Sequence, residues 1–415
     1  MEATAKSMKK DTEHSLSAVK EESKQGFWAV IVVMLGFTFF SPSMTAGGNL
    51  GIGLNMRDFF LAMLLGNAFL GLYTGVLAHV GQSTGLTLDL LARHSFGTKG
   101  SYLPSVLISF TQIGWFGVGV AMFALPVSIL LGINTTLLIF MTGILMTATA
   151  YFGIKALAIL GSIAVPLIAL LGIYSMNVGI NEVAGFGNVF AENPANPLTL
   201  TAALSIVIGS FISGGTATPN FTRFSKTPNI AVWATVIAFF IGNSIMFVFG
   251  AVGGAVTGNA DIFDILIAQG LMIPAILVLG LNIWTTNNNA LYTAGLGLAN
   301  ITKIQSKPMV LLGGTAGTLA AIWLYNNFVA YLSLLGGMIP PVGVVIILHY
   351  FMNKKHYQEE SSEYEEVNPG AIVAVILGSM VGVFLKWGIS PLNALVVSAV
   401  AYTAYEMIIR KKNVS

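Results

Sequence analysis

Long apolar stretches dominate the pattern of hydrophobic and polar positions along this chain. From Gly26 onward, apolar runs of about 20 residues recur, and each is long enough to cross about 30 Å of hydrocarbon as a helix. Polar residues, glycine and proline separate the runs. The pattern predicts an all-α integral membrane protein with twelve transmembrane helices. The predicted spans are 27–52, 57–80, 101–131, 135–154, 156–178, 199–221, 229–257, 263–299, 308–325, 327–352, 369–387 and 391–410.

Two polar segments interrupt this pattern. Residues 1–25 mix lysines and acids without an apolar core, so they predict a disordered cytoplasmic tail and not a signal peptide. Residues 353–368 are rich in glutamate and predict a solvated cytoplasmic loop. Neither segment is long enough to form a domain.

Composition and charge support the membrane assignment. Hydrophobic residues make up 55% of the chain and charged residues 9%, whereas a soluble domain carries about 25% charged residues. With both termini inside, all of the 19 lysines and arginines except Arg57 and Lys386 fall on the cytoplasmic side. The prediction is a multi-pass membrane protein with both termini in the cytoplasm. The chain has no cysteine, which excludes disulfides and thiol chemistry.

The middles of the predicted spans carry no carboxylate, lysine or arginine. A proton-coupled carrier usually needs a titratable relay at that depth. This distribution favours an uncharged substrate, and a coupling ion held by oxygen dipoles and not by a carboxylate.

Two spans contain similar interruptions at mid-membrane depth. In span 1, Pro42 follows a run of phenylalanines and precedes Gly47–Gly48; in span 6, Gly214–Gly215 precedes Pro219. Proline lacks an amide donor and disfavours helix at the residue before it. Spans 1 and 6 are five apart, which gives the two halves opposite orientations, and paired breaks in such halves indicate the central site of a transporter. The alternative is that each break is a kink that serves packing alone.

Spans 3 and 8 correspond by the same offset and carry polar and aromatic clusters. Gln112 and Trp115 are three residues apart and share a helix face, and Trp115 lies near the middle of its span. They predict a binding surface, although interhelical packing is an alternative. In span 8, Thr285 and Thr286 offer uncharged oxygen ligands suited to a monovalent cation; hydroxyls that bond back to their own helix are the alternative.

Three strings resemble the nucleobase–cation symport family, in particular its bacterial members that carry cytosine. They are Gly114–Val120, Gly209–Ser213 and Leu281–Asn287, and the resemblance runs from about Gly26 to the last span. It implies a LeuT-type fold with two inverted five-helix repeats (26–178 and 199–352), two extra helices within 369–415, and broken helices 1 and 6. It further implies a symporter, not an enzyme, that imports cytosine by alternating access with Na+ as coupling ion.

The resemblance also implies a site. Trp115 and Phe211 would sandwich the planar base, Gln112 and Asn282 would read its edge, and backbone groups at Ser213 and Gly214 would be exposed by the break in helix 6. Some relatives place the reading amide one turn further along helix 3, where this chain has Gly119. The implied sodium ligands are carbonyls of Phe37, Phe40 and Asn282 and hydroxyls of Thr285 and Thr286.

Several alternatives stay open. The same fold would suit another nucleobase, an allantoin-like ring or a hydantoin, or coupling to protons. An intramembrane enzyme is disfavoured because the spans offer no acid pair or cluster of metal ligands, and a passive channel would not need paired broken helices. The expected partners are the small-molecule base and the lipid bilayer, with no nucleic acid and no obligate protein partner.

Overall fold

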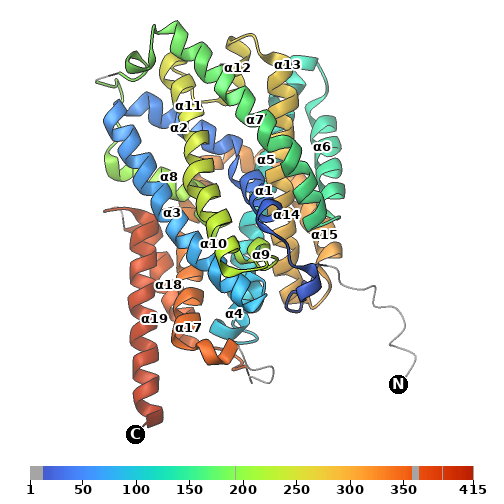
Figure 1. The fold of residues 1–415 in the computed structure, drawn as a ribbon, viewed down its shortest axis with the longest axis vertical. Coiled ribbons are helices and arrows are strands. Elements are labelled where there is room, and N and C mark those ends of the chain that lie inside the picture. The colour runs from blue at the N-terminus through green and yellow to red at the C-terminus, as the bar shows by residue number, and fades with distance from the viewer. Residues whose placement is uncertain (1–12, 192, 358–363, 386, 415) are drawn as a thin grey trace, which may run out of the picture.

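The computed structural model describes residues 13–191, 193–357, 364–385 and 387–414, and the regular elements within these ranges are helices. They pack into one bundle, with the first described residues and the end of α19 at the same end (Figure 1). Six of these helices are long and apolar enough to cross a membrane, or seven if the bent pair α1 and α2 forms one span. The predicted all-α membrane architecture is confirmed.

The first half of the bundle begins with two short helices, and the helices that follow are longer except for α4. Side chains at several N-caps, among them Asn55, Thr87 and Asn134, accept a backbone N–H of the first turn and fix where the helix begins. The helices are α1 (Phe27–Thr38), α2 (Ser41–Gly53), α3 (Met56–Thr84), α4 (Leu88–Phe96), α5 (Tyr102–Leu131), α6 (Thr135–Ala150) and α7 (Ile154–Glu182).

The second half has more interruptions. Its helices are α8 (Leu200–Thr216), α9 (Pro219–Thr222), α10 (Pro228–Val236), α11 (Asn243–Thr257), α12 (Ile262–Ala268), α13 (Met272–Pro274), α14 (Gly280–Thr302), α15 (Ser306–Asn326), α16 (Phe328–Met338), α17 (Pro340–Met352), α18 (Pro369–Phe384) and α19 (Ser390–Val414). Short 3₁₀ turns lie at Glu21–Ser23, Phe186–Asn188 and Lys354–Tyr357. π-helical segments join α10 to α11 (Ile237–Gly242) and α13 to α14 (Ala275–Leu279).

The chain bends by 51° between α1 and α2. Phe39 and Phe40 are non-helical there, and the bend comes directly before Pro42. Because Pro42 has no N–H, the carbonyl of Thr38 has no helical partner four residues on. The predicted interruption of span 1 thus corresponds to a real change of direction at Phe39–Phe40.

α2 is held in this direction by close contact with α11. A side-chain carbon at Gly47 would lie 2.2 Å from the carbonyl oxygen of Phe247, and one at Gly250 would lie 1.7 Å from that of Met44. Glycines on both helices therefore let the two backbones touch, as small residues do in membrane helix pairs.

The interruption of span 6 lies near the C-terminal end of the predicted stretch, before Pro219. α8 stays helical through Ser213 and Gly214 and ends at Thr216, and α9 starts at Pro219. The carbonyl of Gly214 accepts the N–H of Ala217 at 3.0 Å. Ala217 therefore does not bond to the carbonyl of Ser213 four residues before it, and the exposure of the Ser213 and Gly214 backbone remains a prediction.

The predicted span 263–299 is divided into a short helix and a long helix. α12 is a short separate helix, and Gly270, with φ +75°, makes the turn that leads into α13. The long helix runs from Met272 through the π-helical segment to Thr302. A left-handed glycine inside a continuous apolar run accounts for the difference.

The prediction of a disordered tail over residues 1–25 is wrong for residues 13–25, which pack against the bundle. Residues 1–12 lie outside the described part of the chain. Ser15 and Val19 are buried, and the N–H of Val19 donates to the carbonyl of Gly85 at 2.9 Å. Gln25 pairs with Ser225 in a parallel bridge. The segment packs beneath α3 and α9 because the buried Arg223 supplies donors for its carbonyls, at 2.7 Å to both His14 and Glu13.

Candidate functional site

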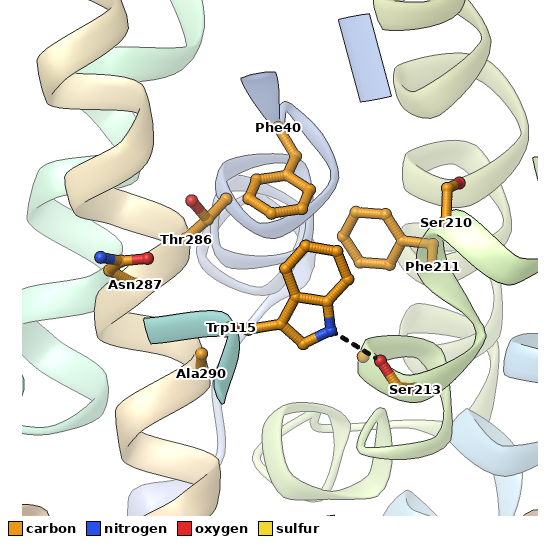
Figure 2. Close-up of a pocket in the computed structure, with 9 residues that line it drawn as sticks. Phe40, Trp115, Ser210, Phe211, Ser213, Thr286, Asn287 and Ala290 are labelled. Atoms are coloured by element: carbon orange, nitrogen blue, oxygen red, sulfur yellow. Dashed lines mark hydrogen bonds between the residues drawn. The ribbon is translucent and has the colours of Figure 1, made fainter. Parts of the chain in front are cut away.

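A cavity lies where the α1–α2 bend faces α5, α8 and α14. Its free volume is about 20 Å³, because side chains fill most of the space between the helices. Figure 2 shows the aromatic rings gathered at its centre. The lining residues are Phe40, Trp115, Ser210, Phe211, Ser213, Gly214, Thr286, Asn287 and Ala290. None of these carries a charge, so the cavity suits an uncharged ligand.

Three rings form the centre of the cavity. The Phe40 ring meets Trp115 edge to face at 5.3 Å between centroids and meets Phe211 at 5.8 Å. Trp115 donates from its indole nitrogen to the Ser213 hydroxyl at 3.0 Å, which fixes the plane of the indole. The structure thus brings the predicted pair Trp115 and Phe211 to one cavity. A flat ligand between them would have to displace the Phe40 ring, which contacts both.

The two predicted reading amides do not line this cavity. Gln112 is 1% exposed, and its side-chain nitrogen has no hydrogen-bond partner. The amide of Asn282 is committed to the bend between α1 and α2. Its oxygen accepts from the N–H of Ser41 at 2.7 Å and from the Ser41 hydroxyl at 2.5 Å, and its nitrogen donates to the carbonyl of Phe39.

Oxygen atoms of α14 and α1 converge next to the cavity. The Thr285 hydroxyl lies 2.7 Å from the carbonyl oxygen of Asn282 and 3.3 Å from that of Gly36. The Thr286 hydroxyl lies 3.1 Å from the same Asn282 carbonyl. Both threonines bond back to their own helix, as the alternative interpretation expected, yet one of them also reaches α1. A cluster of neutral oxygens of this kind fits a hard cation of low charge.

The carbonyls of Phe37 and Phe40, the predicted ligands from α1, are not the ones that contact α14 side chains. The carbonyl of Phe40 accepts the N–H of Ser43 at 2.9 Å in the first turn of α2. The α1 carbonyls that bond to α14 side chains are those of Gly36 and Phe39, each one residue before the predicted Phe37 and Phe40. The oxygen cluster therefore draws on the stretch from Gly36 to Phe40, and the two predicted ligands remain a prediction.

Sequence reasoning did not single out several lining residues: the Phe40 ring, Ser210, Asn287 and Ala290. For Asn287, the sequence contained one indication, which is the glycine at position 119 of α5. A side-chain carbon at Gly119 would lie 2.2 Å from the side-chain oxygen of Asn287. The space left free by a missing side chain on α5 is filled by an amide from α14.

The bent helix pair, the uncharged cavity and the apolar helices around it define a multi-pass membrane transporter. The family model described as permease for cytosine/purines, uracil, thiamine, allantoin matches residues 18–405. The chain belongs to this permease family. Its relatives are named permeases and transporters, in agreement with the prediction that it is not an enzyme.

Individual relatives place the chain more closely. It is 52% identical over 406 residues to the cytosine permease of Escherichia coli (strain K12), covering 98% of this chain and 97% of the relative. It is 22% identical over 389 residues to the allantoin permease of Bacillus subtilis (strain 168), covering 81% of this chain and 79% of that one.

Solved structures confirm the predicted fold type. The closed conformation of Mhp1, a nucleobase-cation-symport-1 family transporter with bromovinylhydantoin bound, matches with a TM-score of 0.81 at 19% identity and covers 96% of both chains. A Na+-coupled sialic acid symporter in a substrate-bound outward-open state matches with a TM-score of 0.73 at 14% identity, covering 96% of this chain and 92% of the other. These likenesses show the fold.

Proposed function

We propose that this protein is a sodium-coupled symporter that imports cytosine across the bacterial cytoplasmic membrane by alternating access. Its twelve spans would comprise the inverted repeats 26–178 and 199–352 and two further helices, with both termini in the cytoplasm. The observation that carries the proposal is the uncharged cavity with Trp115 and Phe211 on its walls, in a chain 52% identical to a cytosine permease.

The cavity favours a small planar base for energetic reasons. Stacking on an aromatic side chain contributes about 1–3 kcal/mol per base face, and two faces plus two or three hydrogen bonds correspond to roughly micromolar affinity. A carrier has to release its load, so much tighter binding would slow transport. In this proposal the Phe40 ring, which contacts both Trp115 and Phe211, withdraws to admit the base, and its place at the α1–α2 bend would couple ligand entry to that bend.

The neutral oxygen cluster supports sodium as the coupling ion. The residues that would hold it are Phe37 and Phe40 through their carbonyls, Asn282 through its carbonyl, and Thr285 and Thr286 through their hydroxyls. A bound sodium ion supplies a positive charge that draws the oxygen dipoles of α1 and α14 together. The chain's own contribution is to fix the bend, through the Asn282 amide, beside the cavity that receives the base.

The proposal is tested by cytosine binding to the purified protein with and without sodium. We expect saturable binding that is strengthened by sodium but not by potassium. Trp115→Ala should lose about 10- to 100-fold in cytosine affinity because one stacking face is removed. Trp233→Ala is the matched control, because Trp233 lies on α10 and is 60% exposed.

Other outcomes would replace the proposal. Binding that responds to pH and not to sodium would assign proton coupling. Stronger competition by another nucleobase or by a hydantoin would change the substrate while keeping the fold. Normal cytosine binding by Trp115→Ala would remove this cavity from consideration.

A further inference from the structure

Asn287 is the one amide side chain among the residues that line the described cavity. It lies on α14 directly after Thr286 and is 1% exposed. Figure 2 shows its side chain with the oxygen on the side of the aromatic rings and the nitrogen on the far side. Its orientation decides whether it offers a ligand an acceptor or a donor.

Two partners fix this orientation. The Asn287 nitrogen donates to the carbonyl of Phe116 at 3.1 Å and to the sulfur of Met146 at 3.2 Å. Both partners are acceptors, so a flipped amide would set its oxygen against the Phe116 carbonyl and lose both contacts. The side-chain oxygen of Asn287 is therefore held toward the cavity as an acceptor.

α5 makes room for this arrangement at one position. A side-chain carbon at Gly119 would lie 2.2 Å from the Asn287 oxygen, so even alanine there would push the amide aside. The neighbouring asparagine of α14 does not share the role, because Asn288 exchanges hydrogen bonds with Thr149 of α6 at 2.9 and 3.1 Å. Asn282 is bound to the bend of α1 and α2.

We propose that Asn287 is a specificity-determining residue that selects a base carrying an amino group on the edge facing α14. Cytosine presents N–H donors at the position where uracil presents a carbonyl oxygen. Facing the fixed Asn287 oxygen, the amino group gains a hydrogen bond, while the carbonyl places two acceptors together and leaves both unpaired. This inference rests on the proposed function and adds the reason for discrimination between two bases of nearly equal shape.

The test measures the affinities of labelled cytosine and of uracil as competitor on the purified full-length protein, in sodium. We expect the unaltered protein to prefer cytosine by about 100-fold or more, since a site built to hydrogen-bond one group rejects the analogue that lacks it. Asn287→Leu keeps the branched shape of the side chain and removes the acceptor. It should weaken cytosine at least about tenfold and leave uracil within about threefold, so that the preference falls.

Two further variants make the result specific. Gly119→Ala displaces the Asn287 amide without changing that residue and should lower the cytosine preference in the same direction; it carries the test if Asn287→Leu does not fold. Asn288→Leu is the matched control, since it removes a buried asparagine of the same helix that faces α6, and should keep the preference.

The outcomes separate this inference from the proposed function. If the unaltered protein prefers cytosine and both Asn287→Leu and Gly119→Ala keep that preference, the role of Asn287 is overturned and the proposed function stands. If the unaltered protein binds no nucleobase, the proposed function fails and the inference fails with it. A preference lost in Asn288→Leu as well as in Asn287→Leu would also overturn the specific role.

Discussion

Asn282 joins two helices through a single side-chain amide. Its oxygen and nitrogen satisfy the N–H of Ser41 and the carbonyl of Phe39, which are backbone groups that a continuous helix would have paired internally. A buried backbone group left without a partner costs about 1–3 kcal/mol. The residue that the resemblance assigned to base reading is thus engaged in stabilising the bend, which is why we propose the reading role for Asn287.

His94 gives a prediction for the pH dependence of stability. It lies on α4 outside the apolar spans, with its ring stacked on Tyr357 at 4.3 Å between centroids. Burial, together with the nearby charges of His356 and Arg93, lowers the pKa of His94 from 6.5 to about 4. The unfolded chain therefore binds the proton more readily, and the stability that neutral His94 provides is present above about pH 6.5 and lost as the pH falls toward 4.

The measurement is thermal unfolding of the purified protein between pH 7 and pH 4, compared with His94→Phe. The variant keeps a ring against Tyr357 and removes the titration, so the difference in stability between the two proteins should change by up to about 3 kcal/mol across this range. A constant difference from pH 7 to pH 4 would mean that His94 is accessible to protons in the folded state.

At the scale of elements, Arg223 holds the N-terminal segment 13–25 against the bundle. Its guanidinium is fully buried and donates to the carbonyls of Glu13 and His14 and to the hydroxyl of Tyr292. Arg223→Met keeps the bulk of the side chain and removes these donors. We expect the segment to detach, because its carbonyls would otherwise be buried without partners.

The chain has no cysteine, so a single one placed at the exposed Ser17 can carry a spin label. The rotational motion of the label should be slow in the parent protein and markedly faster in Arg223→Met. Lys226→Met is the control, since the side chain of Lys226 is exposed beside the same segment. Equal mobility in both variants would show that other contacts hold the segment.

The glycine contact between α2 and α11 gives a second prediction at this scale. Alanine at position 250 would place a carbon 1.7 Å from the backbone oxygen of Met44, which has no free space to retreat. Overpacking of this kind typically costs about 1–3 kcal/mol, so Gly250→Ala should unfold at a lower temperature in detergent. Gly209→Ala on α8 should not, because nothing lies within 4 Å of the added carbon.

The sequence predicted those elements whose cause is local. Pro42 removes a donor from its own helix, and the bend between α1 and α2 lies directly before it. α8 ends at Thr216, also inside a stretch whose glycines and Pro219 predicted an interruption. The order in segment 13–25 could not be foreseen, because it depends on Arg223, about 200 residues away in sequence, and its own composition is that of a solvated tail.

The residues of the cavity also differ in whether their roles depend on local sequence or on distant parts of the chain. Trp115 could be singled out because it lies near the middle of its span, whereas Phe211 was assigned only through the family resemblance. The Phe40 ring and Asn287 could not be singled out, because their roles depend on how side chains of different helices meet in the folded protein. Gly119, which lacks a side chain opposite Asn287, is the one sequence feature noted that indicates this contact between helices.

At the scale of the whole molecule, one residue belongs to both parts of the site. Thr286 lines the cavity and its hydroxyl also joins the oxygen cluster at the Asn282 carbonyl. If sodium strengthens the binding of cytosine at these neighbouring parts, cytosine must strengthen the binding of sodium by the same factor. Removing the shared hydroxyl should lower both affinities and reduce the factor that links them.

Thr286→Val keeps the shape of the side chain and tests this linkage. Sodium titrations with and without cytosine, and cytosine titrations with and without sodium, should give the same coupling factor in the parent protein. In the variant that factor should fall about fivefold or more, toward one, because typical coupling corresponds to 5- to 150-fold. Thr315→Val, on an exposed face of α15, controls for the substitution itself. Full coupling in Thr286→Val would place the cation elsewhere, and the bend of α1 and α2 would then respond to the base alone.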